Sequence, residues 1–335
     1  MMNNLSHELR TPIAAIHAAL GLLQSGKVHP HSARGQRLLS IASDNTQRLL
    51  RVTTALEGSA SSTDARLQVV DLERLRLEAD LYAAWERGKF AVFYQPIVCT
   101  RSQRIIALEA LLRWHHPRRG WVSPTVFIPL AEELGLIAAL GDWVLSKACQ
   151  QLQVWQAQFP SPQPLAVSVN LSPLQLGQPQ LVQTIRDLLQ QTNLAHGSLH
   201  LEITESAPLE NSAAAIKGLQ QLKSLGISLY LDDFGTGYSS LWRLPELAID
   251  VLKVDRVFVA RQQWPLIRGI FHLAASLGIK VVVEGIETAA ELAQVQSQGC
   301  YCYQGYHFSP PVEAAEATRL LQHYNEALRG VQPVA

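Results

Sequence analysis

The sequence has few cysteines, no long apolar run and no excess charge of either sign. Its four cysteines, Cys99, Cys149, Cys300 and Cys302, match neither a zinc motif nor a disulfide framework. We therefore expect reduced thiols in or near the core of a cytoplasmic protein. No apolar run approaches the roughly 18 residues of a membrane span, and no signal peptide opens the chain. The 28 basic and 28 acidic residues balance, so nothing indicates a nucleic-acid or anionic-membrane surface.

The composition describes a globular protein with a sizeable core. Hydrophobic residues make up 47% of the 335 positions and charged residues 17%. This length suits one large domain, or a large domain with a small one.

Residues 1–57 predict two helices that form a hairpin. Apolar residues recur at helical spacing from Leu5 to Leu23 and again from Leu38 to Val52, with a break at 26–30 between them. Such a hairpin buries too little surface to be stable alone, so we expect a homodimer in which two hairpins form a four-helix bundle. The Ser/Ala-rich stretch 58–66 predicts a flexible linker, drawn here as residues 58–70.

Residues 71–328 predict an α/β fold, a (β/α)₈ TIM-like barrel. Eight short apolar runs alternate with amphipathic helical stretches, at the length and rhythm of such a barrel. The predicted strands are 91–98, 104–114, 165–170, 199–204, 228–233, 251–254, 280–284 and 302–306. The turn between the first two is too short for a crossover, so the first strand should run antiparallel to the second.

Polar residues end most of these strands, and barrel sites are built at the C-terminal strand ends. The candidates are Glu109, Arg113, Asn170, Glu202, Asp232, Asp233, Lys253, Glu284 and Gln304. Five converging carboxylates would repel one another strongly, and one Lys and one Arg cannot neutralise them. Bound divalent cations resolve this, and oxygen ligands favour Mg²⁺ or Mn²⁺. We expect the adjacent His115 and His116 to be loop residues rather than ligands.

The adjacent pair Asp232–Asp233 is the centre of the predicted site. Neighbouring side chains in a strand point to opposite faces, so both can serve one site only where the strand ends and the backbone turns at Gly235 and Gly237. An Asp-rich turn or a helix cap is the alternative interpretation of the pair.

Residues from 71 to about 325 resemble the EAL family of cyclic di-GMP phosphodiesterases. The matching motifs are 94–97 (YQPI), 109–114 (EALLRW), 127–132 (FIPLAE), 168–172 (SVNLS), 201–205 (LEITE), 232–241 (DDFGTGYSSL), 253–255 (KVD), 284–287 (EGIE) and 304–306 (QGY). Val283 and the 301–303 stretch (YCY) depart from the family pattern beside Glu284 and Gln304.

The resemblance implies hydrolysis of cyclic di-GMP to linear pGpG with two Mg²⁺ or Mn²⁺ ions. It assigns the first metal to Glu109, Asn170, Glu202 and Asp232, and the second to Asp232, Asp233 and Glu284. Lys253 would contact the attacking water and Gln304 would support the water network, while Glu205 would hold the loop after Asp233. The resemblance also implies that Arg113 contacts the phosphate of the substrate and that Gln95 contacts the substrate.

The stretch 6–12 (SHELRTP) resembles the phosphoacceptor box of sensor histidine kinases. The resemblance makes His7 the phosphoacceptor, with Glu8 as a base, and implies a partner histidine kinase or response regulator. No ATP-binding domain follows the hairpin, so self-phosphorylation is not expected. The alternative to an active phosphodiesterase is a catalytically weak cyclic di-GMP receptor or scaffold that is regulated through this hairpin.

Overall fold

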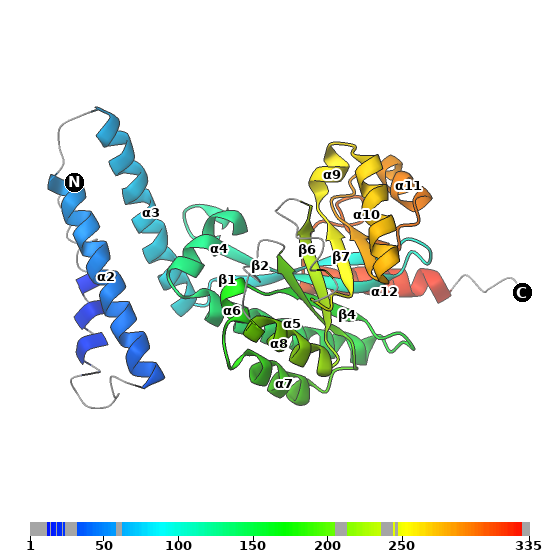
Figure 1. Cartoon of the computed structure of the whole chain (residues 1–335), viewed down its shortest axis with the longest axis horizontal. Helices are drawn as coiled ribbons and strands as arrows, with labels where there is room; N and C mark the ends of the chain where they lie inside the picture. The colour runs from blue at the N-terminus through cyan, green and yellow to red at the C-terminus, as the bar shows by residue number, and fades with distance from the viewer. Residues whose placement is uncertain are drawn as a thin grey trace, which may run out of the picture. The chain divides into compact units, whose positions relative to one another are not determined.

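The chain folds into two compact units, Met1–Gly88 and Lys89–Ala335 (Figure 1). This computed structural model describes residues 12, 13, 15–17, 19–21, 23, 32–57, 62–204, 213–235, 244 and 247–329. The first unit corresponds to the predicted hairpin and the segment after it, and the second to the predicted barrel.

The first unit is helical, as its apolar spacing predicts. The described residues between Pro12 and Leu23 are in helix, α2 spans Ala33–Glu57 and α3 spans Ser62–Glu86. The Arg48 guanidinium of α2 donates a 2.9 Å hydrogen bond to the Leu75 carbonyl of α3, so these two helices pack side by side. Across the described ranges, no helix combines the length and the apolar character that a membrane crossing requires.

The structure differs from the prediction in the segment expected to be a flexible linker, residues 58–70. From Ser62 onward this segment is the beginning of α3, which continues to Glu86. No glycine or proline occurs between Ser62 and Gly88. Single Ser, Thr and Asp residues do not stop a helix when a long run of helix-forming residues follows. The boundary predicted at Asp71 therefore falls inside a helix, whereas the compact units divide at Gly88.

Eight strands close into a barrel, which confirms the predicted fold. They are β1 (Phe90–Cys99), β2 (Ile105–His116), β4 (Ala166–Asn170), β5 (Leu199–Thr204), β6 (Ser228–Phe234), β7 (Val251–Val254), β8 (Lys280–Val283) and β9 (Cys302–Tyr303). Each pairs with the next, and β9 pairs back with β1 to close the ring. Two short strands were not predicted, β3 (Gly120–Val122) and β10 (Val312–Glu313). They pair antiparallel with β2 and β1, respectively.

The first strand is antiparallel to both of its neighbours in the barrel, as the short β1–β2 turn predicts. Its register with β2 places Gln95 opposite Glu109, and its register with β9 places Cys99 opposite Cys302. The other neighbouring pairs around the ring, from β2–β4 to β8–β9, are parallel. The C-terminal ends of seven strands therefore meet at the end of the barrel where β1 begins.

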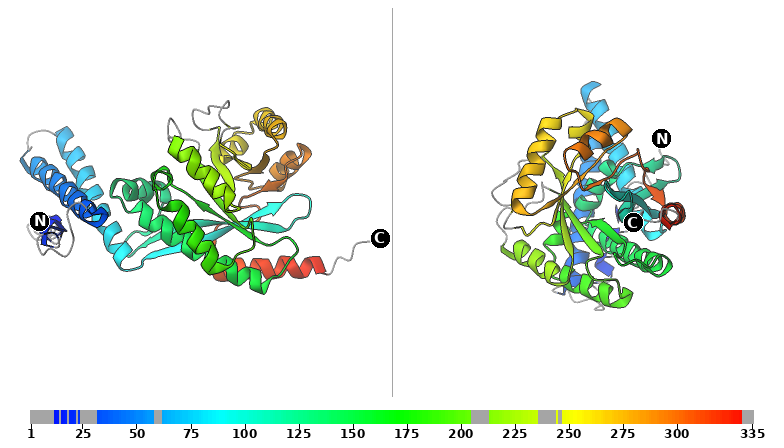
Figure 2. Two further views of the ribbon diagram at one scale, coloured as in Figure 1. Left: turned by 60° about the horizontal axis from the view of Figure 1, so that its bottom comes forward. Right: turned by 90° about the vertical axis from the view of Figure 1, so that its right-hand side faces the viewer.

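The helices of the second unit lie outside the strands (Figure 2). They are α4 (Pro124–Glu133), α5 (Ile137–Gln158), α6 (Pro173–Leu176), α7 (Leu181–Thr192), α8 (Ala213–Ser224), α9 (Arg256–Ala260), α10 (Trp264–Leu277), α11 (Ala289–Ser297) and α12 (Ala314–Arg329). Local sequence fixes several ends. Thr288 and Glu291 form a capping box at the start of α11, and Gly278 closes α10 with a left-handed φ of 70°.

Side chains alternate between the two faces of each strand and so form two apolar layers. One face of each strand packs against the surrounding helices in the main core, which includes Val167, Leu201 and Leu252. The other face points into the barrel, where a second cluster contains Ile97, Cys99, Ala107, Ala166, Tyr230, Val251, Val282 and Cys302. All four cysteines are free and buried, as expected. The polar site residues follow these interior positions along the same strand faces.

Candidate active site

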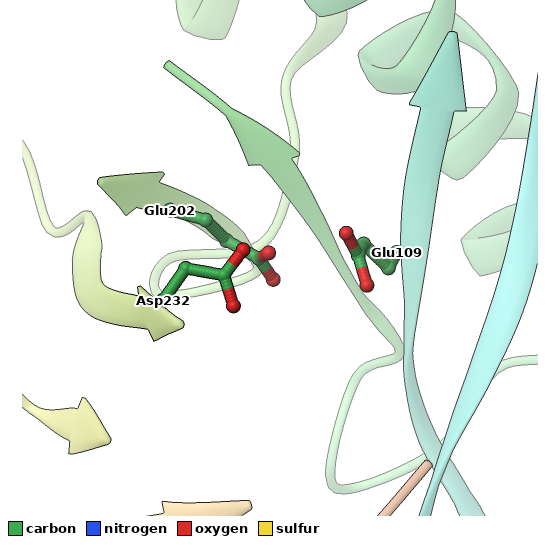
Figure 3. A group of neighbouring side chains, drawn as sticks. All are labelled: Glu109, Glu202 and Asp232. Carbon is green, nitrogen blue, oxygen red and sulfur yellow. The ribbon is translucent and has the colours of Figure 1, made fainter. Parts of the chain in front are cut away.

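Carboxylates from four strands converge at the C-terminal end of the barrel. Glu109, Glu202 and Asp232, on β2, β5 and β6, point toward one another (Figure 3), each offering an oxygen within 4.8 Å of the others. Asp232, Asp233 and Glu284 form a second group that meets the same limit. Asp232 belongs to both groups, so the structure brings together all five carboxylates that the sequence indicated.

The backbone explains how adjacent aspartates serve one site. The register of β6 with β7 shifts between Leu231 and Phe234, and Asp233 takes a left-handed φ of 55°. A bulge at a strand end redirects a side chain that would otherwise point to the opposite face. Asn and Asp tolerate this backbone region better than most residues. The expectation that both aspartates converge where the strand ends is therefore met by a bulge rather than by the glycines alone.

Lys253 stands at the centre of the carboxylates and is 1% exposed. Its ammonium lies 2.6 Å from Glu202 Oε2 and 2.7 Å from Glu284 Oε1. It also lies 3.0 Å from Asp232 Oδ1 and 3.3 Å from Glu109 Oε2. Burial acts to lower the pKa of Lys253, but the four carboxylates outweigh burial and raise the pKa well above its usual value. Lys253 is therefore a fixed positive charge inside the cluster.

Amide side chains hold Glu109 in place. Asn170 Nδ2 donates to Glu109 Oε1 at 2.9 Å, and Gln304 Nε2 donates to Glu109 Oε2 at 2.7 Å. Gln304 also donates to Gln95 Oε1 at 2.8 Å, which joins β9 to β1 across the closing seam. Burial acts to raise the pKa of Glu109, but Lys253 and the two amide donors outweigh burial and lower it. Glu109 is thus kept ionised, as a cation ligand must be.

The remaining carboxylates carry more negative charge than their surroundings neutralise. Burial and the charge of Glu109 raise the pKa of Glu202 well above its usual value, although Lys253 opposes this. Burial raises the pKa of Glu284 to about 8, and burial with the neighbouring Asp232 raises that of Asp233 to about 6. Groups crowded in this way favour either protons or cations.

The donor set fits divalent cations. Five carboxylates surround one ammonium, which leaves four negative charges, the charge that two divalent ions would balance. Within the described part of the chain, no hydrogen-bond donor reaches the buried Glu202 Oε1. Asn170 uses its nitrogen toward Glu109, so its oxygen stays available for a cation. Ligand atoms that are all oxygen suit Mg²⁺ or Mn²⁺ better than zinc.

Two hollows meet at the cluster and share Glu109, Leu111, Arg113 and Asp232. The larger, of about 500 Å³, is mostly apolar and includes Ile128 and Val144. The smaller, of about 270 Å³, is the charged hollow, lined by Gln95, Arg113, Arg256, Glu284, Glu287, Gln304 and Tyr306 among others. Arg113 is half-buried, and its guanidinium lies over the Phe93 ring at 5.8 Å from the centroid.

The sequence analysis did not select Arg256 and Tyr306 as site residues. Both follow shortly after a strand end, Arg256 after β7 and Tyr306 after β9, and both line the charged hollow. A cation or an aromatic residue directly after a barrel strand is the signal that would have found them.

The structure places other candidates elsewhere or does not describe them. His7 and Glu205 lie outside the described residues. His115 and His116 end β2 rather than lying in a loop, since the strand extends two residues beyond its predicted end. His116 Nδ1 accepts hydrogen bonds of 3.1 Å from the amides of Arg118 and Arg119, which shapes the turn into β3.

Comparison with known families agrees with this geometry. Residues 78–311 match the EAL domain, and residues 1–59 match the His Kinase A (phospho-acceptor) domain. The chain belongs to the EAL family. The match covers the barrel and every described site residue, and both resemblances that the sequence motifs indicated are confirmed.

Two curated relatives of this EAL barrel are longer proteins. The cyclic di-GMP phosphodiesterase NbdA of Pseudomonas aeruginosa is 34% identical over 329 residues, which cover 97% of this chain and 42% of NbdA. The bifunctional diguanylate cyclase/cyclic di-GMP phosphodiesterase MucR of the same organism is 38% identical over 265 residues, covering 76% of this chain and 37% of MucR. The chain thus spans less than half the length of either relative.

A solved structure reproduces the fold of the EAL barrel. The PaMucR phosphodiesterase in complex with c-di-GMP superposes with a TM-score of 0.68 at 37% sequence identity. The superposition covers 72% of this chain and 99% of the solved chain.

Proposed function

We propose that the protein hydrolyses cyclic di-GMP to linear pGpG with two divalent cations, Mg²⁺ or Mn²⁺. The observation that supports this most directly is the pair of carboxylate groups sharing Asp232, with Lys253 fixed between them. A phosphodiester is anionic and repels an anionic nucleophile. Two cations held by these groups would lower the pKa of a water molecule and balance the charge that develops on the phosphate.

The ligand roles follow from the two groups. Glu109, Asn170, Glu202 and Asp232 would hold one cation, and Asp232, Asp233 and Glu284 the other. Because Asp232 is common to both groups, it would fix the spacing of the two ions.

Lys253 and Gln304 would act on the water and its surroundings. The ammonium of Lys253 can donate to a water molecule at the cluster and favour its deprotonated form, since its own charge is permanent. Gln304, already bonded to Glu109 and Gln95, would keep the hydrogen-bond network around that water in place. Glu205, outside the described residues, is proposed to hold the loop after Asp233.

The two hollows suit a cyclic dinucleotide. Such a ligand carries two phosphates and two bases, and here two hollows adjoin one carboxylate centre. Arg113 borders both hollows and would bind a phosphate, Gln95 would contact the ligand from the charged hollow, and Arg256 adds a second cation there. The relatives NbdA and MucR, both named as cyclic di-GMP phosphodiesterases, support the same substrate.

The test is direct incubation of the purified chain with cyclic di-GMP and Mg²⁺ or Mn²⁺, followed by chromatography of the products. We expect pGpG, no product in a chelator, and a rate at least about a hundredfold lower in Asp232→Asn, because a shared ligand contributes several kcal/mol to transition-state stabilisation. Undiminished hydrolysis by Asp232→Asn would refute the two-metal assignment. Binding of cyclic di-GMP with no turnover in either metal would favour the receptor function instead.

The N-terminal unit is proposed to act as a dimerisation element whose His7 receives a phosphoryl group from a partner histidine kinase. The match of residues 1–59 to the phospho-acceptor domain and the helical structure of the described residues within this range support this role. A phosphoryl group would add negative charge to a helical bundle and change its packing. Radiolabel transfer to the chain, absent in His7→Gln, is the expected observation.

A further inference from the structure

Three of the four cysteines gather where β1 and β9 close the barrel. Cys99 ends β1, Cys302 begins β9, and Cys300 lies two residues earlier. All three are free, buried thiols, and the proposed hydrolysis uses none of them.

The register of the two strands brings Cys99 and Cys302 face to face. They are partners in the antiparallel β1–β9 ladder. The neighbouring pair is hydrogen-bonded, with the Thr100 amide donating to the Tyr301 carbonyl at 2.9 Å, whereas the Cys99 amide donates to the Arg104 carbonyl at 2.9 Å. The cysteines therefore form a non-hydrogen-bonded pair, in which side chains approach most closely and Cα atoms are about 4.5 Å apart. A disulfide requires a Cα separation of about 4.4–6.8 Å.

Both thiols also point to the same side of the sheet. Cys99 and Cys302 belong to the apolar cluster inside the barrel, together with Ile97 and Val282. Directly opposed residues on one face of an antiparallel pair have Cβ atoms about 4.5–5.5 Å apart, and the shorter values belong to non-hydrogen-bonded pairs. A disulfide requires Cβ atoms about 3.5–4.5 Å apart, so this pair reaches the upper end of that range.

Cys300 is the competing partner, and its thiol is engaged elsewhere. Its Sγ–H donates to the Cys302 carbonyl, with Sγ 2.9 Å from the oxygen. Cys300 belongs to the main core outside the strands, whereas Cys99 and Cys302 belong to the cluster inside the barrel, so the Cys300 thiol lies on the other side of the sheet. Cys99 therefore has Cys302 as its partner by register.

The two thiols differ in reactivity. Burial acts to raise the pKa of Cys99, but hydrogen bonds from Ser102 and Arg101 and the charge of Arg101 outweigh burial and lower it. Burial raises the pKa of Cys302. Since the thiolate is the nucleophile, Cys99 is the more reactive of the two thiols toward an oxidant.

We propose that Cys99 and Cys302 are an oxidation site, at which a peroxide forms a reversible disulfide between β1 and β9. The Cys99 thiolate attacks the peroxide, the O–O bond breaks, and the sulfur becomes a sulfenic acid, while the leaving hydroxide takes up the proton that Cys99 released and departs as water. The Cys302 sulfur then attacks the Cys99 sulfur, the S–O bond breaks, and the Cys302 proton leaves in a second water. Two thiols lose two electrons and two protons, and one hydrogen peroxide becomes two waters. A dithiol reverses the bond by exchange.

The disulfide would lie directly beneath the carboxylate site. Gln304 follows Cys302 by two residues on the same face, and its amide bonds Glu109 and Gln95. A covalent bond at this seam would fix the strands that carry Gln95 and Gln304. Its formation does not depend on the hydrolysis proposed above, so the test needs no activity assay.

The test exposes the reduced full chain to hydrogen peroxide, alkylates the remaining thiols and maps the tryptic peptides by mass spectrometry. Cys99 falls on peptide 90–101, and Cys300 and Cys302 share peptide 281–319. We expect these peptides to be joined, two of the four thiols to be lost to alkylation, and dithiothreitol to release them. The wild-type map decides the outcome even if a variant folds poorly.

Serine variants assign the partner. The cross-link should persist in Cys300→Ser and in the matched control Cys149→Ser, whose thiol lies in α5 within the other apolar layer. It should be lost in Cys302→Ser. Four alkylated thiols after peroxide treatment of folded protein, a cross-link that disappears in Cys300→Ser, or a bond that dithiothreitol does not release would each overturn the proposal.

Discussion

A single ammonium organises the site at the scale of the residue. Lys253 touches four carboxylates that come from β2, β5, β6 and the end of β8. Without this ammonium the buried carboxylates would lack a neighbouring positive charge, and an unpaired buried carboxylate destabilises the fold strongly. The same residue thus maintains the cluster and presents a fixed charge to the reaction.

Replacing Lys253 separates its effect on substrate binding from its effect on turnover. We expect Lys253→Ala to bind cyclic di-GMP with a dissociation constant near that of the wild type, yet to lose turnover by at least about a hundredfold, since the charge matters most as attack proceeds. Binding by calorimetry and turnover by product chromatography measure the two quantities. Lys223→Ala is the matched control, because Lys223 pairs with Asp250 away from the carboxylates. Equal losses of affinity and rate would make Lys253 a substrate clamp.

The raised carboxyl pKa values predict how the metal-free protein responds to pH. Folding raises the pKa of Glu284 from 4.5 to about 8 and that of Asp233 from 3.8 to about 6. At these two groups the folded state binds more protons than the unfolded state, so the stability that they contribute is fully present at low pH and is lost as the pH rises through their folded-state values. We expect the melting temperature in chelator to fall between pH 6 and pH 8.

Cations should reverse this dependence. Metal ions compete with protons for the same oxygens and bind more tightly as protons leave, so the melting temperature in Mn²⁺ should rise over the same range. Glu284→Gln in chelator should show a flatter profile than the wild type. A wild-type profile that stays flat in chelator would contradict the proposed state of Glu284.

At the scale of the element, β9 is only two residues long and depends on the loop beyond it. The Ile286 amide donates to the Gln304 carbonyl at 3.2 Å, and the His307 amide donates to the Ile286 carbonyl at 2.9 Å. Gly305 allows this approach, since a Cβ there would lie 2.0 Å from the Ile286 oxygen. The loop therefore fixes Gln304 by backbone contact.

Adding one methyl group tests this loop. Gly305→Ala should reduce stability by about 1–3 kcal/mol through overpacking and should also lower turnover by displacing Gln304. Gly269→Ala in α10 is the control, because a Cβ there meets nothing within 4 Å and alanine favours a helix. Urea denaturation and product chromatography report the two effects. Wild-type stability in Gly305→Ala would show that the backbone yields.

The elements show what the sequence can and cannot specify. Short apolar runs between helical stretches predicted all eight barrel strands, because a strand that is buried on both faces is a nearly continuous hydrophobic run. The short strands β3 and β10 were missed, since they exist only by pairing with the edges of β2 and β1. The linker prediction was wrong because local Ser and Asp residues conceal the helix that runs on to Glu86.

The site likewise has a part that the sequence predicts and a part that it does not. Strand-end positions predicted which carboxylates converge. The bulge at Asp233 and the contacts of Lys253 with four of the five carboxylates depend on barrel closure, which no local pattern encodes.

At the scale of the whole molecule, the N-terminal unit is expected to set the oligomeric state. We compare the full chain with a shortened chain that begins at Asp71, which lacks the hairpin and keeps the whole EAL match from residue 78. The full chain should be a dimer with the higher turnover per barrel, and the shortened chain a slower monomer, because the bundle forms only between two copies. Light scattering and product chromatography measure both, with His7→Gln as a point variant. A shortened chain that dimerises and turns over like the full chain would assign no such role to the hairpin.

The seam between β1 and β9 also has a consequence during translation. Gln304 bonds partners 195 and 209 residues earlier in the chain. A ribosome therefore synthesises all five site carboxylates, together with Lys253, before it synthesises the strand that closes the ring. Contacts so distant in sequence form late. A nascent or prematurely terminated chain holds the acidic residues on an open sheet, so the carboxylate site is complete only after translation has passed the last strand of the barrel.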